Sequence, residues 1–119
     1  MLTITLGKIL DNNAPSMAFR PGIYVIREND TVLYVGKSER SVGQRIQEHC
    51  TPRRFSGALD ALGAFVRDTM PNSLELEVDI LSVAECNTIV KALAKTEKEI
   101  EPLMIRHFRP ILNGTFNSK

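Results

Sequence analysis

The chain has 119 residues, a net charge of +1 and a hydrophobic fraction of 43%, which indicate one globular domain with a core of its own. No apolar run approaches the ~18 residues that a membrane span needs. The leader MLTITLGKIL does not resemble a signal peptide, and two cysteines are too few for a disulfide framework. We therefore expect a cytoplasmic protein without a membrane partner. The chain has 15 basic and 14 acidic residues. This balance argues against a protein that binds nucleic acid through a large overall positive charge, and any positive surface has to be local.

The first half of the chain predicts a helix, a hairpin and two further helices. Residues 5–16 have the pattern of a short helix that ends in the turn residues DNNAP. The runs GIYVIRE and TVLYVG, joined by END, predict a β-hairpin. Ser41, with a glutamine three residues later, is a capping box that opens a helix of about two turns. After the loop CTPRRFSG, apolar residues at helical spacing predict a helix over 56–70 with Ser56 as its N-cap.

The second half predicts one strand and an interrupted helix. Apolar and acidic residues alternate over 74–80, which is typical of a half-buried strand. A long helical stretch begins at about Glu85, and we expect Pro102 to kink or break it near the start of a second helical piece. As a whole, the pattern predicts a single α/β domain over residues 1–119. It would have a short N-terminal extension at 1–19 and a mainly antiparallel sheet of about three strands packed with helices.

The two tyrosines of the chain lie in the two arms of the predicted hairpin. Tyr24 follows Gly22 closely, and Tyr34 comes shortly before Gly36. Tyrosine is common in strands, where its ring packs and its hydroxyl finds a hydrogen-bond partner. The pair therefore has two interpretations, a plain hairpin or part of a catalytic site.

Two predicted helices carry polar side chains whose spacing places them on a particular face of the helix. Arg45 and His49 lie four residues apart and share a helix face that is distinct from the apolar one. Glu101 comes three and four residues before Met104 and Ile105, so its carboxylate would be held where a helix meets the core. A carboxylate in that place has to be paired, hydrogen-bonded or bound to a metal ion. Taken singly, the arginine and the glutamate are equally compatible with a solvated surface.

Together these residues resemble the GIY-YIG nucleases. The matching residues, in chain order, are Gly22-Ile23-Tyr24, Tyr34-Val35-Gly36, Arg45, Glu101, Pro110 and Asn113. Valine stands where the second motif commonly has isoleucine. The resemblance covers residues 20–113 and is similar in spacing to the nuclease half of the bacterial excision-repair incision subunit and to homing endonucleases. The predicted helix over 56–70 would be an addition to the minimal family domain.

The resemblance implies an enzyme that hydrolyses DNA phosphodiester bonds with one divalent ion. The ion, Mg²⁺ or Mn²⁺, would lie on Glu101, since a hard cation accepts one carboxylate and fills its shell with waters and substrate phosphate. Arg45 would neutralise the charge that develops on the phosphate. Asn113 would orient Glu101 or a bound water.

The resemblance also implies that Tyr24 and Tyr34 hold the nucleophilic water and that one of them is the general base. We favour Tyr34 slightly, because it precedes Lys37 and the Arg45 helix. A free phenol titrates near ~10, so a neighbour has to lower that pKa or take the proton onward. The candidates are Lys37, His49 and Arg45.

The substrate is the least constrained part of this interpretation. Lys37 and Arg40 are the expected phosphate contacts, and Arg53 and Arg54 either join them or belong to an ordinary solvated loop. The DNA would be duplex or branched, and a protein partner or a homodimer would supply specificity. Two alternatives remain open: a ribonuclease, and a catalytically inactive module that keeps the fold for nucleic-acid binding or protein interaction.

Overall fold

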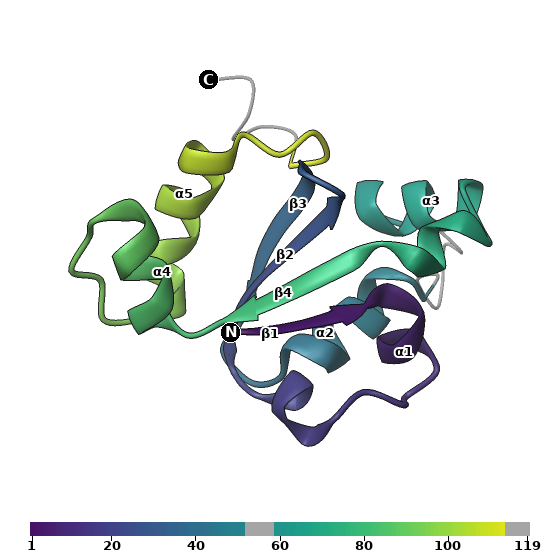
Figure 1. Cartoon of the computed structure of the whole chain (residues 1–119), viewed down its shortest axis with the longest axis horizontal. Helices are drawn as coiled ribbons and strands as arrows, with labels where there is room; N and C mark the ends of the chain where they lie inside the picture. The colour runs from purple at the N-terminus through teal and green to yellow at the C-terminus, as the bar shows by residue number, and fades with distance from the viewer. Residues whose placement is uncertain (52–58, 114–119) are drawn as a thin grey trace.

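The computed structural model of the chain describes residues 1–51 and 59–113. These residues form a four-stranded antiparallel sheet with helices on both faces (Figure 1). The strands are β1 (Leu2–Thr5), β2 (Gly22–Glu28), β3 (Thr31–Ser38) and β4 (Glu77–Leu81), in the order β1-β4-β2-β3. The helices are α1 (Leu6–Leu10), α2 (Val42–His49), α3 (Ala61–Asp68), α4 (Val83–Val90) and α5 (Glu97–Phe108), with 3₁₀ turns at Ser16–Phe19 and Asn72–Glu75. The predicted α/β class with an antiparallel sheet is confirmed.

The sheet separates two hydrophobic clusters. Figure 1 shows α4 and α5 on one side of the sheet and α1, α2 and α3 on the other. Successive residues of a strand point to opposite faces, so Tyr24 packs in the cluster of α1, α2 and α3 while Ile23 and Val25 pack against α4 and α5. The fold therefore points the tyrosine of the first arm toward α2.

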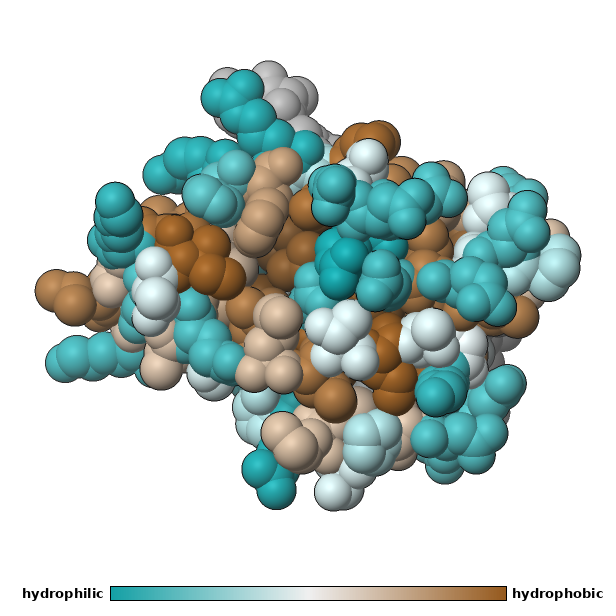
Figure 2. Space-filling model, in the orientation of Figure 1, coloured by the Kyte–Doolittle hydropathy of each residue, from teal (hydrophilic) through white to brown (hydrophobic). Residues whose placement is uncertain are grey.

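The surface mixes residue types. On the face drawn in Figure 2, hydrophilic and hydrophobic residues are interspersed over the helices and the sheet. In the described ranges, no helix combines the length and the apolar run that crossing a membrane takes.

The N-terminal segment contributes a strand that the sequence pattern did not predict. The predicted helix over 5–16 is α1, which is shorter, and β1 precedes it and pairs with β4 along its whole length. A run of only four residues, LTIT, carries too little periodicity to be recognised without its partner. The sheet therefore has four strands where about three were expected, and residues 1–19, predicted as an extension, supply β1 and α1 to the sheet and core.

The middle of the chain follows the predicted order with shifted boundaries. The helix predicted over 56–70 is the shorter α3, and Asp60 is its N-cap, because the Asp60 side chain accepts a hydrogen bond from the Gly63 amide. The predicted cap, Ser56, lies outside the described residues. The strand predicted over 74–80 starts later, at Glu77, because the 3₁₀ turn occupies the residues before it.

The predicted break at Pro102 is wrong, because the chain breaks earlier. α4 ends at Val90, its C-cap Lys91 adopts a left-handed conformation with φ of 56°, and α5 begins after its N-cap Thr96. Pro102 lies inside α5, where it cannot donate a hydrogen bond to the carbonyl of Lys98. The buried Ile100 and its neighbours on α5 pack on the sheet, and this packing keeps the helix continuous across the proline.

We expect Pro102→Ala to raise the free energy of unfolding by about 1–3 kcal/mol, because alanine restores one helical hydrogen bond and removes a clash. Chemical denaturation measures the change. Pro15→Ala is the matched control, since Pro15 lies outside any α-helix with φ of −65°, and its loss should destabilise the chain slightly by freeing the unfolded state. A decrease in stability for Pro102→Ala would contradict this account of α5.

Candidate active site

The site lies at the outer edge of β3. The segment after α5 runs along this edge, where Ile111 donates to the Val32 carbonyl at 3.4 Å and Leu112 donates to the Leu33 carbonyl at 2.8 Å. Among the described residues, the bonds of this segment to β3 end at Val35. Within the described residues, the last part of β3 is thus an open strand edge, with α2 against one face of the sheet and α5 against the other.

The two tyrosines stack on the α2 face of this edge. Tyr24 is opposite Gly36 in the β2–β3 register, and a Cβ atom on Gly36 would lie 2.3 Å from the Tyr24 Cζ atom. Gly22 is needed for space in the same way, because its Cβ atom would lie 2.6 Å from the Leu81 carbonyl oxygen. The Tyr24 and Tyr34 rings are 6.0 Å apart and nearly parallel. The motif glycines therefore make room for the Tyr24 ring and for β4.

His49 joins the tyrosines to the end of α2. Its Nε2 atom lies 2.7 Å from the Tyr24 hydroxyl oxygen, and its ring is 5.3 Å from the ring of Tyr34. Its Nδ1 atom is hydrogen-bonded to the Asp60 carboxylate. Tyr24 and His49 are only 1% and 3% exposed. The prediction grouped His49 with Arg45 and missed Asp60, because the helix predicted over 56–70 placed Asp60 inside the helix and not at its N-cap.

Burial shifts the pKa of both tyrosines upward. Burial raises the pKa of Tyr24 well above its ordinary value, Tyr34 and Glu101 add to the rise, and Arg45 opposes it. Burial also raises the pKa of Tyr34, again with Glu101 adding and Arg45 opposing. Both phenols are therefore neutral at neutral pH, and neither is a ready tyrosinate.

The pKa values of His49 and Asp60 are lowered. Burial lowers the pKa of His49, and the hydrogen bond and charge of Asp60 only partly offset this. For Asp60, burial pushes the pKa up, but the hydrogen bonds from Gly63 and His49 and the positive charge of Arg45 outweigh it, and the pKa is lowered. At neutral pH a neutral imidazole thus faces an ionised carboxylate.

Glu101 faces the same edge from α5. It is half-buried, and burial raises the pKa of its carboxyl group, while Lys37 and Arg45 oppose the rise. Its charge also raises the pKa of Tyr24 and of Tyr34. Within residues 1–51 and 59–113, no side-chain hydrogen bond or ion pair reaches the Glu101 carboxylate. A half-buried carboxylate without a partner suits a divalent cation.

A metal ion at Glu101 would depend on non-protein ligands. In the part of the chain that the structure describes, no three His, Cys, Asp or Glu side chains converge into a metal site. One carboxylate with waters and phosphate oxygens is a coordination that Mg²⁺ accepts. Glu101 can therefore hold such an ion only in a hydrated or substrate-bound form.

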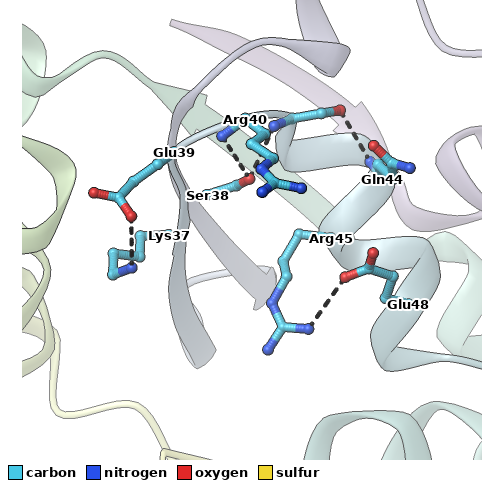
Figure 3. A pocket seen from close by; sticks show the side chains of 8 residues that line it. Lys37, Ser38, Glu39, Arg40, Gln44, Arg45 and Glu48 are labelled. Atoms are coloured by element: carbon cyan, nitrogen blue, oxygen red, sulfur yellow. Dashed lines mark hydrogen bonds and ion pairs between the residues drawn. The ribbon is translucent and has the colours of Figure 1, made fainter. Parts of the chain in front are cut away.

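A polar pocket of about 260 Å³ lies between the end of β3 and α2 (Figure 3). Its lining consists of Lys37, Ser38, Glu39, Arg40, Ser41, Gln44, Arg45 and Glu48. The Lys37 ammonium lies 3.7 Å from Glu39, and the Arg45 guanidinium lies 3.4 Å from Glu48. The pocket thus brings three cations together with two carboxylates, and it includes the predicted Arg40. The predicted Arg53 and Arg54 lie outside the described residues.

A comparison with known protein families decides the family. Residues 20–113 match the model of the GIY-YIG catalytic domain. The chain belongs to the GIY-YIG family. The match confirms the resemblance that we inferred from the motifs, and it covers the same residues. Members of this family are generally nucleases, so the site is of the nuclease type. Searches of the curated proteins and of the solved structures found no match.

In this GIY-YIG domain, the motif asparagine has a partner that the sequence did not predict. The Asn113 side-chain oxygen accepts from the Val35 amide at 2.9 Å, and its Nδ2 donates to the Val35 carbonyl at 2.7 Å. Both polar atoms of the Asn113 side chain bond to Val35, whereas the sequence predicted that this side chain would orient Glu101 or a bound water. It pairs with β3 as a neighbouring strand would, between Tyr34 and Gly36.

We expect Asn113→Ala to lower the free energy of unfolding by about 1–3 kcal/mol, because two hydrogen bonds are lost. Amide exchange at Val35 should become faster. Asn87→Ala is a matched control, since Asn87 makes the same pair of bonds with Ala94, at 3.0 and 2.8 Å, in the α4–α5 loop. It should cost similar stability without changing exchange at Val35. Unchanged exchange at Val35 in Asn113→Ala would contradict the role assigned to Asn113.

Proposed function

We propose that this GIY-YIG domain is a metal-dependent endonuclease that hydrolyses DNA phosphodiester bonds, with one Mg²⁺ or Mn²⁺ ion on Glu101. The observation that supports it most is the grouping of Tyr24, Tyr34 and His49 at the open edge of β3, with Glu101 facing the same edge. A module kept only for binding has no need of a buried hydrogen-bonded tyrosine–histidine pair beside a carboxylate that has no side-chain partner among the described residues.

In this proposal the proton of the attacking water leaves through Tyr24. The water lies between the two hydroxyls, and its oxygen forms the new bond to phosphorus while the bond to the leaving oxygen breaks. The Tyr24 oxygen takes the proton of the water as the Tyr24 hydroxyl proton passes to His49 Nε2, 2.7 Å away. A free tyrosinate, which the raised pKa of Tyr24 disfavours, never has to form. Tyr24 therefore replaces Tyr34, which the sequence favoured, as the general base.

Charge on the phosphate is balanced from two sides. When bound, the metal ion would polarise the phosphate and stabilise the leaving oxygen. Arg45 supplies a planar cation that is always protonated. Its partner Glu48 lies 3.4 Å away, and both side chains are largely exposed. Such a surface pair is weak, so a phosphate oxygen can take the place of Glu48.

DNA binding would be modest and local. Lys37, Arg40 and Arg45 are the cations of the pocket, and Glu39 and Glu48 partly neutralise them. Few phosphate contacts mean a weak and sequence-independent electrostatic term. Selection of a particular duplex or branched site would therefore need a protein partner or a second copy of the chain.

We expect Tyr24→Phe and Tyr34→Phe to cut DNA ~10²–10⁴-fold more slowly than the parent, because each removes a hydroxyl that holds or relays the water. The ring and its packing remain, so the free energy of unfolding should fall by only about 1 kcal/mol in Tyr34→Phe. In Tyr24→Phe it should fall by about 1–3 kcal/mol, because His49 Nε2 stays buried without its partner. Cleavage rates and denaturation curves measure the two effects. If both variants cut at the rate of the parent, the tyrosines serve only to pack the hairpin.

We expect Glu101→Gln to abolish cleavage while leaving the fold and most DNA affinity intact, because it removes the charge that holds the metal ion but keeps the shape. The assay uses linear, nicked and branched DNA with and without Mg²⁺. Glu97→Gln, in the first turn of the same helix, is the control and should cut normally. Mg²⁺-dependent cutting that survives in Glu101→Gln would transfer the metal site to another carboxylate. A parent that cuts none of these DNAs would favour the inactive binding module.

A further inference from the structure

Asp60 contacts the histidine of this site but is not one of the motif residues that identify the family. It lies on the opposite side of the His49 ring from Tyr24, in a line Tyr24 hydroxyl, His49, Asp60 carboxylate. We propose that Asp60 is a positioning residue, which holds the proton of His49 on Nδ1 so that Nε2 remains an acceptor for the Tyr24 hydroxyl. This inference rests on the proposed nuclease function for its kinetic consequence, although the tautomer itself can be measured without it.

The two oxygens of the Asp60 carboxylate bind different partners. Oδ1 accepts the Gly63 amide at 2.9 Å and so caps α3. Oδ2 is bonded to Nδ1 of His49. The carboxylate cannot rotate without breaking one of these bonds, so the helix cap fixes the oxygen that faces the histidine.

The first turn of α3 packs directly against His49, and Asp60, the N-cap of α3, binds the ring of this histidine. A Cβ atom on Gly63 would lie 2.0 Å from the carbonyl oxygen of His49, so only glycine lets the first turn of α3 approach the end of α2 this closely. The His49 ring is thereby held between β2 and α3. This helix was predicted as an addition to the minimal family domain, and here it would contribute to the site.

The chemistry of the two partners fixes the tautomer. An ionised carboxylate can only accept hydrogen bonds, so Nδ1 has to carry the proton and Nε2 is left with a free lone pair. When Nε2 takes the proton of Tyr24, the imidazolium that forms lies beside a negative charge, which stabilises it. Among residues 1–51 and 59–113, the titratable and charged groups around His49 are Tyr24 on β2, Tyr34 on β3, Arg45 and Glu48 on α2, and Asp60 before α3. Arg45 opposes the imidazolium, and Asp60 is the acceptor that contacts the ring.

If Asp60 served only as the N-cap of α3, the choice of residue at position 60 would be less restricted. Aspartate and asparagine are equally good N-caps, so a residue needed only for capping could be either. In Asp60→Asn, the side-chain oxygen would keep the hydrogen bond from the Gly63 amide. The side-chain NH₂ would then face Nδ1 of His49. Nδ1 would then have to accept, the proton would move to Nε2, and the Tyr24 hydroxyl would lose its acceptor. The substitution therefore separates the cap from the relay.

The first measurement is ¹⁵N NMR of the histidine ring in the free protein at neutral pH. The parent should show a protonated Nδ1 and an unprotonated Nε2 at His49, and Asp60→Asn should show the reverse. The chain has only two histidines, so a His49→Gln sample assigns the signals. Asp68→Asn, the same change on an exposed residue of α3, should leave the tautomer unchanged. A parent with the proton on Nε2, or an Asp60→Asn protein that keeps it on Nδ1, would overturn the proposal.

The second measurement is DNA cleavage, with thermal unfolding in parallel. Asp60→Asn should lower kcat by ~10²–10⁴-fold with little change in KM, whereas Asp68→Asn should match the parent. Cleavage by Asp60→Asn at the parental rate would also overturn the proposal. If the parent does not cut DNA, the proposed function fails, and the NMR result still decides the role of Asp60.

A second variant covers the case in which Asp60→Asn does not fold. Asp60→Ser keeps a cap oxygen but is too short to hold Nδ1, so the His49 ring should show a mixture of both tautomers. Because Asp60 raises the pKa of His49 against the effect of burial, its removal should also move the acid limb of the kcat profile to lower pH. A single Nδ1-protonated tautomer and an unmoved limb would show that Asp60 acts only as a cap.

Discussion

The hydrogen bond between the Tyr24 hydroxyl and His49 Nε2 is the interaction on which the rest of the site depends. Both groups are almost fully buried, and a buried polar group without a partner would cost about 1–3 kcal/mol. Each satisfies the other, so the bond that joins β2 to the end of α2 also sets the orientation of the reactive groups. In the proposed nuclease, stability and chemistry would therefore act through the same pair of atoms, and Asp60 binds the other side of the His49 ring from the N-cap of α3.

The site can exist because β3 is the edge strand and because Gly36 has no side chain. The missing Cβ atom lets the Tyr24 ring cross the strand, and the open edge lets α2 and α5 present groups from opposite faces of the sheet. Asn113 closes the edge just before this point, through both of its polar atoms. An edge strand with free backbone groups is usually a liability, and here the exposed part of the edge is kept short by the C-terminal segment.

Local signals in the sequence were enough for the elements whose stability is local. The cap at Ser41 starts α2 where it was predicted, with its hydroxyl accepting from the Gln44 amide, and the hairpin pairs around its predicted turn. Predictions failed where packing outweighs local preference. The four residues of β1 form a strand only because β4 lies beside them, and α5 continues through Pro102 because its apolar face is buried against the sheet.

The family, the fold class and the set of tyrosine, arginine, glutamate and asparagine residues follow from motif identity and spacing, which are properties of the linear chain. The contacts of those residues do not. His49 and Asp60 are separated by 11 residues, and Asn113 and Val35 by 78. An aspartate before a helix has the same sequence pattern whether its second oxygen faces solvent or a histidine ring. Only the packing of α3 on α2 brings that oxygen to His49, because a contact between distant segments depends on how their backbones approach in space.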